Sequence, residues 1–465
     1  MAENTIIMEN TLRKLLAEKK YATLREILIT MNPADVAAIF NEMEEDRLPL
    51  LYRLLPKELA ADTFVEMDQD AQELLIRGFS DSELKEVLDE LFVDDAVDII
   101  EEMPATVVKR ILSQADPDMR RSINEILRYP ESSAGSIMTT EYISLRPEMT
   151  VSEAITRIRR TGIDKETIYT CYVTKDRTLI GVVTVKDLLL CDDDDKHISD
   201  VMMEKVISVN THDDQEEVAQ MFSKYNFMAL PVVDGENRLV GIVTFDDAMD
   251  VMEEEATEDI EKMAAIIPSE KPYMSMTPFE IWKKRIPWLM LLMVSATFTG
   301  IIISHFEDAL AALVILTAFI PMLMDTAGNS GSQASVTVIR GLSLNEIEFK
   351  DIMPIIWKEL RVAVLCGISL AAACFVKILL VDYLIMGNFN SNLNGNNPFL
   401  IIGVICITLA ITILFAKVVG CSLPLFAKKM GFDPAVMASP FITTIVDALS
   451  LLVYFGVANV FLNLS

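Results

Sequence analysis

The sequence predicts a multidomain membrane protein with an all-α superhelical domain, a pair of α/β domains and an α-helical transmembrane domain of five spans. Three observations support this fold class. Short helical patterns recur at a fixed step in the first part of the chain. A stretch with alternating strand and helix patterns then occurs twice, and five apolar runs follow within residues 273–465.

The N-terminal repeat has a step of 24 residues. The step separates four aspartates, each at the start of a helical pattern: Asp46, Asp70, Asp94 and Asp118. Short helix pairs that repeat in this way stack into a superhelix with one continuous core, which we assign to residues 1–130. Capping is the favoured role for these aspartates. The stretch VDDAVD, with Asp94, Asp95 and Asp98, holds more acid than a cap requires.

The second part of the chain is duplicated. Residues 136–158 are matched by residues 200–222, and IGVVTVKDLLL (180–190) is matched by VGIVTFDDAMD (240–250). Each copy predicts the order strand, helix, strand, strand, helix, with a hairpin between the last two strands. We place the two α/β domains at residues 131–198 and 199–252.

Five apolar runs are long enough to cross a bilayer, which takes about 20 residues. They cover residues 286–304, 309–340, 362–385, 398–416 and 434–462. Buried globular helices are the alternative, but five such runs within residues 273–465 argue against it. We therefore assign residues 273–465 to a transmembrane domain.

The distribution of Lys and Arg predicts the orientation of these spans. Lys283, Lys284 and Arg285 precede the first run. Arg340, Lys350, Lys358 and Arg361 lie between runs two and three, and Lys417, Lys428 and Lys429 lie between runs four and five. The loops HFED and GNFNSNLNGNNP contain none. The rule that basic loops stay inside places the N-terminus in the cytosol and, with five spans, the C-terminus outside.

Charge separates the two halves of the chain. Residues 1–272 hold 58 Asp and Glu against 29 Lys and Arg, a net charge of 29 − 58 = −29, whereas residues 273–465 hold 11 of each. The acidic surface of the soluble half argues against nucleic acid and anionic lipid as partners and favours cations. Residues 1–10 lack the basic and apolar regions of a signal peptide, so we expect this half to remain cytosolic.

Catalytic and zinc-binding motifs are absent from the sequence. The six cysteines form no C-x-x-C pair, and the three histidines are scattered. We find no nucleophile–base set and no P-loop, so an enzyme is the least favoured class.

Asp447 is a carboxylate inside the last apolar run. An ionised carboxylate at the bilayer centre costs about 2.5–3.5 kcal/mol on insertion scales and marks function by default. Thr443, Thr444 and Ser450 add oxygen atoms nearby. The structural alternative is an ion pair with Lys377 of the third run, or a protonated side chain.

The second run ends in the polar stretch MDTAGNSGSQAS (324–335). Asp325, Asn329 and Gln333 are spaced by four residues and share one helix face, while Gly328 and Gly331 allow close backbone contact. Helix packing and pore lining are both compatible with this pattern. Oxygen ligands suit hard cations, and Mg²⁺ retains water, so one carboxylate from each of two chains fits a hydrated Mg²⁺ ion.

Residues 246–272 form an acidic connecting segment. DDAMDVMEEEATEDIEKM (246–263) has nine acids in eighteen residues. One helical stripe holds Asp247, Asp250, Glu254, Glu258 and Glu261. A solvated linker helix is the usual interpretation of such a charge run. Like charges four residues apart destabilise an isolated helix, so bound cations would offset this repulsion.

The chain resembles a known family over essentially its whole length. GVVTVKD (181–187) and GIVTFDD (241–247) resemble the ends of paired CBS domains. A helical N-domain, paired CBS domains, an acidic connecting helix and five spans resemble the MgtE family of magnesium channels. The most specific stretches are EATEDIEKMAAI, GNSGSQAS and DPAVMASPFITTIVDALSLLVYFGVA.

The resemblance implies a function and a set of sites. Family members are homodimers that import Mg²⁺ across the plasma (inner) membrane and are closed by intracellular Mg²⁺. Asp447 matches the carboxylate of the pore ion, and the resemblance would place an acid at Asn226 in some members. The implied cytosolic Mg²⁺ sensors are Asp94, Asp95 and Asp98 with Asp247, Asp250, Glu254, Glu255, Glu258, Asp259 and Asp433. The expected pore lining is Asp325, Gly328, Asn329, Gly331, Gln333, Thr443 and Thr444. Some members bind adenine nucleotide in the CBS cleft, which makes it a candidate cofactor beside Mg²⁺.

Two other functions stay open from the residues alone. An ion-coupled exchanger needs a second acid within the spans, for which Asp325 and Asp382 are the candidates. A membrane-anchored nucleotide sensor would not depend on Asp447.

Overall fold

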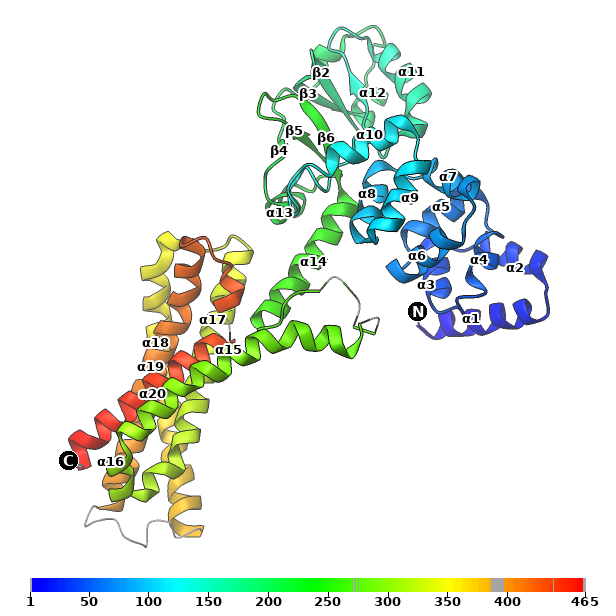
Figure 1. Cartoon of the computed structure of the whole chain (residues 1–465). Helices are drawn as coiled ribbons and strands as arrows, with labels where there is room; N and C mark the ends of the chain where they lie inside the picture. The colour runs from blue at the N-terminus through cyan, green and yellow to red at the C-terminus, as the bar shows by residue number, and fades with distance from the viewer. Residues whose placement is uncertain are drawn as a thin grey trace. The chain divides into compact units, whose positions relative to one another are not determined.

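The computed structural model describes residues 2–269, 271, 273–274, 276–385, 397–437 and 439–462. The chain divides into two compact units, Met1–Met252 and Glu253–Ser465. Figure 1 shows a helical array and two small sheets in the first unit and long helices in the second. The predicted external loop GNFNSNLNGNNP lies mostly outside the described residues.

The N-terminal array consists of short helices that follow one another closely. They are α1 (Ala2–Ala17), α2 (Tyr21–Leu28), α3 (Pro33–Asn41), α4 (Leu48–Tyr52), α5 (Lys57–Val65), α6 (Gln69–Gly78), α7 (Asp81–Leu88), α8 (Val93–Glu102), α9 (Ala105–Gln114) and α10 (Pro117–Ile126). Helices α6, α8 and α10 begin at residues 69, 93 and 117, which confirms the step of 24 residues.

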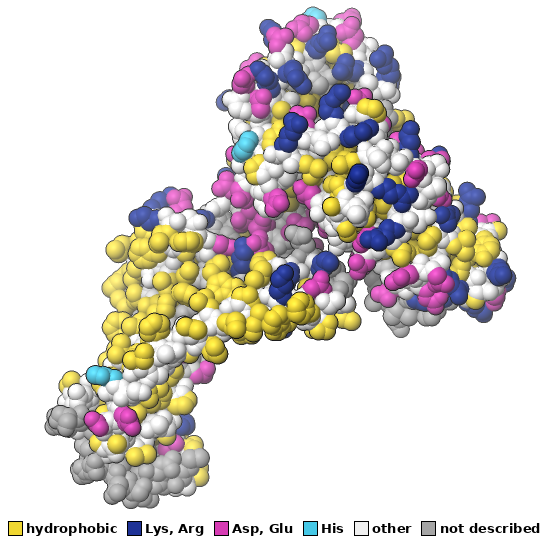
Figure 2. Space-filling model, viewed as in Figure 1, with side chains coloured by type: hydrophobic (Ala, Val, Ile, Leu, Met, Phe, Trp, Pro, Cys, Tyr) yellow, Lys and Arg dark blue, Asp and Glu magenta, His cyan; other side chains and the backbone are white. Residues whose placement is uncertain are grey.

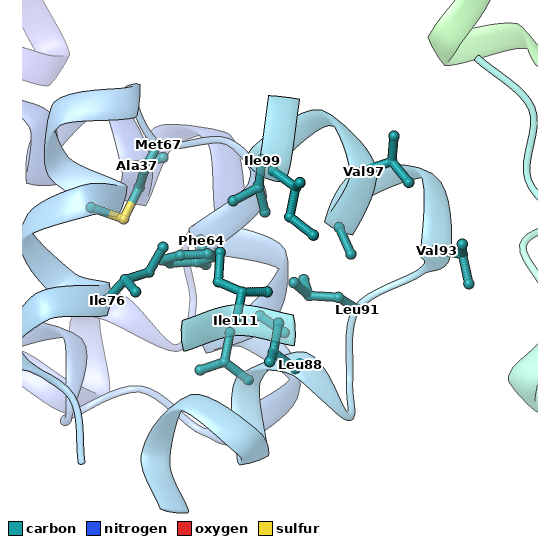
Figure 3. Packing of buried hydrophobic residues seen from close by; sticks show 14 of the residues in the cluster. Ala37, Phe64, Met67, Ile76, Leu88, Leu91, Val93, Val97, Ile99 and Ile111 are labelled. Atoms are coloured by element: carbon teal, nitrogen blue, oxygen red, sulfur yellow. The ribbon is translucent and has the colours of Figure 1, made fainter. Parts of the chain in front are cut away.

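One hydrophobic core runs through the array. Phe64, Ile76, Leu88, Val97 and Ile111 come from five consecutive helices and are all buried, as Figure 3 shows. The same cluster continues into buried side chains of the second α/β domain. The helical array and the duplicated module therefore pack as one body within the first unit.

The duplicated module forms two sheets of the same design. The first copy contains β1 (Ser144–Leu145), α11 (Val151–Thr161), β2 (Thr170–Lys175), β3 (Thr178–Thr184) and α12 (Val185–Leu189). The second contains β4 (Val209–Asn210), α13 (Gln215–Tyr225), β5 (Ala229–Val233), β6 (Leu239–Thr244) and α14 (Phe245–Met263). In each copy a parallel pair precedes an antiparallel hairpin, with a register shift at the corresponding place. The predicted duplication is confirmed.

The acid after each hairpin begins a helix. Asp187 and Thr184 form a reciprocal capping box at α12, and the Asp247 carboxylate likewise accepts hydrogen bonds from the backbone N–H and hydroxyl of Thr244. Local capping therefore explains why GVVTVKD and GIVTFDD both place an Asp three residues after the Thr. Asn226 ends α13 in the left-handed region at φ 55°, a conformation that asparagine tolerates better than most residues.

The second unit consists of α-helices together with short 3₁₀-helices (η3, η4 and η6) and a π-helical segment (η5). Its elements are α15 (Pro278–His305), α16 (Glu307–Ala312), η3 (Val314–Phe319), α17 (Ile320–Ser343), η4 (Phe349–Asp351), α18 (Ile352–Lys377), η5 (Ile378–Ile385), α19 (Pro398–Lys429), η6 (Pro434–Met437) and α20 (Ser439–Leu462). The acidic helix α14 ends at Met263, before the predicted limit of 272, because Ala265 turns to positive φ and Pro268 follows.

Four helical segments in the described residues are long and apolar enough to cross a membrane: Pro278–His305, Phe349–Ile385, Pro398–Lys429 and Pro434–Leu462. They contain four of the five predicted spans. The remaining predicted span, residues 309–340, folds as α16, η3 and α17. Helix α17 packs against α19 and α20, whereas its Asp325, Asn329 and Gln333 side chains are exposed.

Lys417 corrects the predicted loop between the last two spans. The predicted fourth span ends at Ala416, which would place Lys417 in a basic loop. Helix α19 instead continues to Lys429, and Lys417 is only 4% exposed. An ion pair with Glu359 of α18 at 3.6 Å allows this lysine to remain in a buried position.

Two glycines bring α17 and α19 into close contact. A Cβ built at Gly420 would overlap the carbonyl group of Gly331, which is backbone and cannot rotate away. A Cβ at Gly403, also on α19, would meet nothing within 4 Å. The packing of α17 therefore depends on glycine at position 420 and not at position 403.

We expect Gly420→Ala to destabilise the transmembrane domain by about 1–3 kcal/mol, because the added methyl group forces the two backbones apart. Gly403→Ala is the matched control and should be neutral or slightly stabilising, since alanine favours helix. Thermal unfolding of the full-length protein in detergent measures both. An equal loss in the two variants would contradict the close contact between α17 and α19.

Candidate functional site

The first turn of α8 buries a carboxylate. Asp94 is 6% exposed, and its Oδ1 atom has no hydrogen-bond partner. Phe92 occupies the N-cap position of α8, and no side chain caps the helix there. Capping, the role favoured by the sequence for this residue, does not explain Asp94. An unpaired buried carboxylate costs several kcal/mol unless a proton or a cation neutralises it.

Other carboxylates surround Asp94. Those acting most strongly on it are Asp247 of α14, Asp95, and Glu166 and Glu141 of the first α/β domain. Glu141 Oε2 accepts the backbone N–H of Val93 at 3.0 Å, and the Glu141 carbonyl accepts the N–H of Glu166 at 3.0 Å. The first of these contacts ties the first α/β domain to the start of α8, and the second holds Glu166 beside Glu141 within that domain. We call Asp94, Asp95, Glu141, Glu166 and Asp247 the acidic cluster.

Burial and mutual repulsion both raise the pKa values in the acidic cluster. Burial is the larger cause at each residue, and neighbouring carboxylates add to it. The pKa of Asp94 lies well above its ordinary value. The pKa of Asp95 rises to about 7, that of Glu166 to about 8 and that of Asp247 to about 6. Near neutral pH the cluster therefore resists full ionisation and favours binding of a cation.

Oxygen is the only ligand atom that these side chains offer. Carboxylate oxygens suit Mg²⁺ and Ca²⁺, and Mg²⁺ keeps several of its own waters. In the part of the chain that the structure describes, no three His, Cys, Asp or Glu side chains form a closed metal cage. The carboxylates of the acidic cluster thus converge, and a hydrated ion could bridge them.

The cluster differs in part from the predicted sensor set. Asp94, Asp95 and Asp247 come together as predicted, whereas Asp98 and Asp250 lie on exposed faces of α8 and α14. Sequence reasoning missed Glu141 and Glu166. Each is a single acid in a loop, without spacing or charge density to mark it, and only the docking of the first α/β domain on α8 brings them to Asp94.

A second charged group lies at the end of α14, within the second unit. Lys262 pairs with Glu258 and, at 2.6 Å, with Asp433 just before η6. The Ser343 hydroxyl, at the end of α17, donates to Asp259 Oδ2 at 3.0 Å. Burial raises the pKa of Asp259. Three predicted sensor acids therefore lie where α14 contacts the end of α17 and the start of η6.

Asp447 lies on α20 where that helix faces α17. A Cβ built at Gly328 of α17 would lie 3.2 Å from Thr443 Cγ2 and 3.7 Å from Asp447 Oδ1. Asp447 is partly exposed, and Asp325 of α17 is the charged residue that acts on it. The Thr443 and Thr444 hydroxyls donate to the Pro440 carbonyl at 3.0 Å, which leaves their oxygen atoms able to accept.

Helix α17 separates packing residues from polar residues. Gly328 and Gly331 are buried against α20 and α19, whereas Asp325, Asn329 and Gln333 are exposed along an adjacent face. The predicted shared face is confirmed. An exposed stripe of polar side chains on a helix of the membrane domain cannot face lipid without a large cost, so it requires water or protein beside it.

Two charged pairs lie within the apolar helices. Lys377 Nζ donates to Asp382 Oδ2 at 2.9 Å and lies over the Phe319 ring. The alternative ion pair between Lys377 and Asp447 is therefore wrong. Lys417 pairs with Glu359. Among the described residues, Asp447 makes no ion pair and no hydrogen bond through its carboxylate.

Comparisons with known proteins agree with this architecture. Residues 320–457 match the family model described as a divalent cation transporter, residues 31–132 match the MgtE intracellular N domain, and residues 134–193 and 198–254 match CBS domains. The magnesium transporter MgtE of Thermus thermophilus is 34% identical over 97% of this chain and 98% of its own length. The chain belongs to the MgtE family.

The relatives of this MgtE-family chain are of similar length and include solved cytosolic domains. The Bacillus subtilis magnesium transporter MgtE is 33% identical over 97% of this chain and 96% of its own length. The crystal structure of the cytosolic domain of the Mg²⁺ channel MgtE in complex with ATP matches with a TM-score of 0.50 and 37% identity. It covers 52% of this chain and 99% of that one. The chain is therefore a multi-pass Mg²⁺ transporter with an intracellular N domain, and not an enzyme.

The pKa shifts predict a pH-dependent stability of α8. Each raised pKa lies above the value of about 4 that Asp and Glu have when unfolded. Ionisation therefore weakens the folded form, so stability is greatest below about pH 4 and falls as pH rises towards 8. In metal-free full-length protein, the hydrogen-exchange protection of α8, corrected for intrinsic rate, should fall at least about tenfold from pH 5 to pH 8.

Magnesium provides the control for this measurement. About 10 mM Mg²⁺, chosen to saturate weak carboxylate sites, should restore the protection of α8 at pH 8 and change little at pH 5, where protons already neutralise the cluster. Helix α5, which is remote from the cluster, should respond to neither change. Protection of α8 that is independent of pH and of Mg²⁺ would show that the cluster binds no cation.

Proposed function

We propose that this chain forms a homodimeric channel that imports Mg²⁺ across the plasma (inner) membrane and that cytosolic Mg²⁺ closes. The observation that carries the proposal is the carboxylate of Asp447, which lies in a membrane helix against Gly328 without a cationic partner. Transport of Mg²⁺ by the family supplies the reason for such a residue: a divalent cation passes it.

The pore is formed by α17 and α20. Asp447 supplies negative charge, and Thr443, Thr444, Asn329 and Gln333 supply neutral oxygen atoms. One carboxylate is too few to replace the water around Mg²⁺, which dehydrates reluctantly. A two-fold axis beside the exposed face of α17 would bring two copies of Asp447 towards one hydrated ion and would cover the polar stripe with protein and water. Gly328 and Gly331 let α17 approach α20 and α19 closely enough to shape that pore.

The acidic cluster is the sensor for cytosolic Mg²⁺. With little Mg²⁺ present, repulsion opposes the docking of the first α/β domain and α14 on α8. Bound Mg²⁺ offsets the repulsion and stabilises the docked form. A ligand shifts such an equilibrium only by its preference for one form, so several weak sites acting together give a steep response.

Helix α14 supplies the connection from sensor to pore. It spans 19 residues, with Asp247 near its start and Asp259 near its end. Its last turns contact Ser343 of α17 and, through Lys262, Asp433 at the start of η6. Met263 packs with Ile339 and Ala435 in the same region. A shift of α14 would therefore act on the two segments that lead into the proposed pore helices.

The remaining sensor acids would act along the same helix. Glu254 and Glu255 lie on α14 between the two groups, and Glu258 and Asp433 already share Lys262. We assign them the weaker role of binding hydrated Mg²⁺ at the surface of α14. Asp98 and Asp250 are exposed and would contribute charge rather than direct ligands.

Adenine nucleotide is a second ligand that we infer for the CBS pair. The support is the solved cytosolic domain in complex with ATP, which is 37% identical to this chain and covers 52% of it. Nucleotide binding would add to Mg²⁺ sensing rather than replace it, because the acidic cluster and Asp447 lack a role in a protein that senses nucleotide alone.

Ion-coupled exchange finds less support in the structure. Of the two further acids predicted within the spans, Asp382 is 7% exposed and paired with Lys377. Glu359 of α18 is likewise paired, with Lys417. In the described part of the chain Asp325 and Asp447 are left as unpaired acids within the spans, and in our proposal both face the pore.

We also propose the membrane orientation that the basic loops predict, in which the N-terminus is cytosolic and the C-terminus lies outside the cell.

Asp447→Asn should reduce Mg²⁺ flux in proteoliposomes by at least about tenfold, because the amide keeps the size of the side chain but removes the charge that attracts a divalent ion. Asp308→Asn makes the same chemical change on exposed α16 and should leave flux unchanged. Unaltered flux in Asp447→Asn would refute the proposed pore.

Asp247→Asn should raise the cytosolic Mg²⁺ concentration needed for half-closure several-fold, because it removes one charge from the acidic cluster and keeps an oxygen that can cap α14. Asp187→Asn is the matched control: Asp187 has the same capping role in the first copy and lies outside the cluster. Current recordings on inside-out membrane patches with titrated Mg²⁺ test both. Equal responses would remove Asp247 from the sensor.

A further inference from the structure

A pocket of about 320 Å³ lies beside the first turns of α15, within the second unit. Lys271, Lys284 and Arg285 line it, together with Tyr273 and, from α14, Thr257 and Glu261. The three cations exceed the one carboxylate by two charges, 3 − 1 = +2. Neither Mg²⁺ transport nor Mg²⁺ sensing accounts for a pocket that is positively charged and would repel that ion.

The polar contacts in the pocket leave donors available. Glu261 Oε2 accepts the backbone N–H of Ser269 at 2.8 Å, so its carboxylate is engaged with the chain. Lys284 Nζ donates to the Pro268 carbonyl at 2.7 Å and, as an ammonium group with three protons, keeps further donors. Arg285 and Lys271 are exposed. The pocket thus presents ammonium and guanidinium groups to a ligand that accepts hydrogen bonds and carries negative charge.

The first turns of α15 place this pocket at the edge of the membrane. Phe279 and Trp282 stack with ring centroids 5.3 Å apart and are 68% and 52% exposed. Neither ring lines the pocket, to which α15 contributes Ile281, Lys284 and Arg285. Aromatic side chains of this kind gather at the level of lipid headgroups. Figure 2 shows Lys and Arg side chains on this part of α15 beside the hydrophobic surface of the second unit.

The apolar part of α15 begins directly after Arg285, at Ile286. The same end of the helix faces the side of the intracellular N domain, since it follows that domain and α14 in the chain. With the apolar part of α15 in the membrane, the pocket would lie at the depth of the phosphates in the cytosolic leaflet. Basic pockets at this level recognise the headgroups of anionic lipids, and nearby Lys and Arg add attraction to the negative leaflet.

We propose that Lys271, Lys284 and Arg285 bind the phosphate of an anionic phospholipid in this pocket. The phosphodiester would receive hydrogen bonds from the two basic residues of α15, and Lys271 would close the opposite side. Since Thr257 and Glu261 of α14 line the same pocket, the headgroup would also contact the acidic connecting helix. The site depends on insertion of α15 in the membrane and not on the proposed Mg²⁺ gate.

Native mass spectrometry of the full-length protein tests this site. The probes are phosphatidylglycerol and phosphatidylcholine with identical acyl chains, each titrated against the same detergent-solubilised protein. Phosphatidylglycerol should bind more tightly, and the double variant Lys271→Gln with Arg285→Gln should weaken it by roughly fivefold for each charge removed. Lys283→Gln is the matched control, because Lys283 is equally basic and adjacent but does not line the pocket.

Each result of these titrations either supports the lipid site or overturns it. Loss of phosphatidylglycerol binding in the double variant, with retention in Lys283→Gln, supports the site. Equal binding by all three proteins, or equal binding of the two lipids, overturns it. A further arm adds about 10 mM inorganic phosphate, a large excess over weak anion binding: displacement of the lipid would assign the pocket to free phosphate instead. Circular dichroism of each variant confirms that lost binding does not reflect unfolding.

Discussion

Carboxylate charge without a cationic partner is the constraint on which the structure depends. Asp94 is buried beside other acids at the start of α8, and Asp447, on α20 beside α17, has no partner among the residues that the structure describes. In a medium of low polarity such groups are costly and persist only if something neutralises them part of the time. A mobile divalent cation can do so at both places, and its presence or absence then changes the energy of each arrangement.

The helices of the membrane domain leave only a few carboxylates without a partner, so the free-energy cost of unpaired charge is confined to those residues. Lys377 neutralises Asp382, and Lys417 neutralises Glu359, so the bundle keeps its other buried charges in pairs. The close approach of Gly331 and Gly420 packs α17 against α19, and Lys428 Nζ of α19 donates to the Leu342 carbonyl of α17 at 3.1 Å. Rigid packing of this kind keeps the unpaired face of α17 and the Asp447 carboxylate in defined positions, which selective passage of an ion requires.

Helix α14 and the start of α15 connect the soluble and membrane parts by different chemistry. Acids on α14 attract divalent cations, whereas Lys271, Lys284 and Arg285 form a basic pocket beside it. Under the roles we propose, opposite charges close to one another in the chain would let this region bind two kinds of ligand, a metal ion at α14 and a phosphate in the basic pocket. Both would act on the same helix, so lipid composition and Mg²⁺ concentration could influence one element.

The sequence by itself determined the domain order, the 24-residue helical step, the duplicated α/β module, four of the apolar spans and the prominence of Asp447. These features follow from periodicity and composition, which are local properties of the chain. Only the tertiary structure decided that Glu141 and Glu166 join Asp94 and that Lys417 is buried beside Glu359. Such contacts join residues from separate elements, and their energy depends on distances that no sequence pattern records.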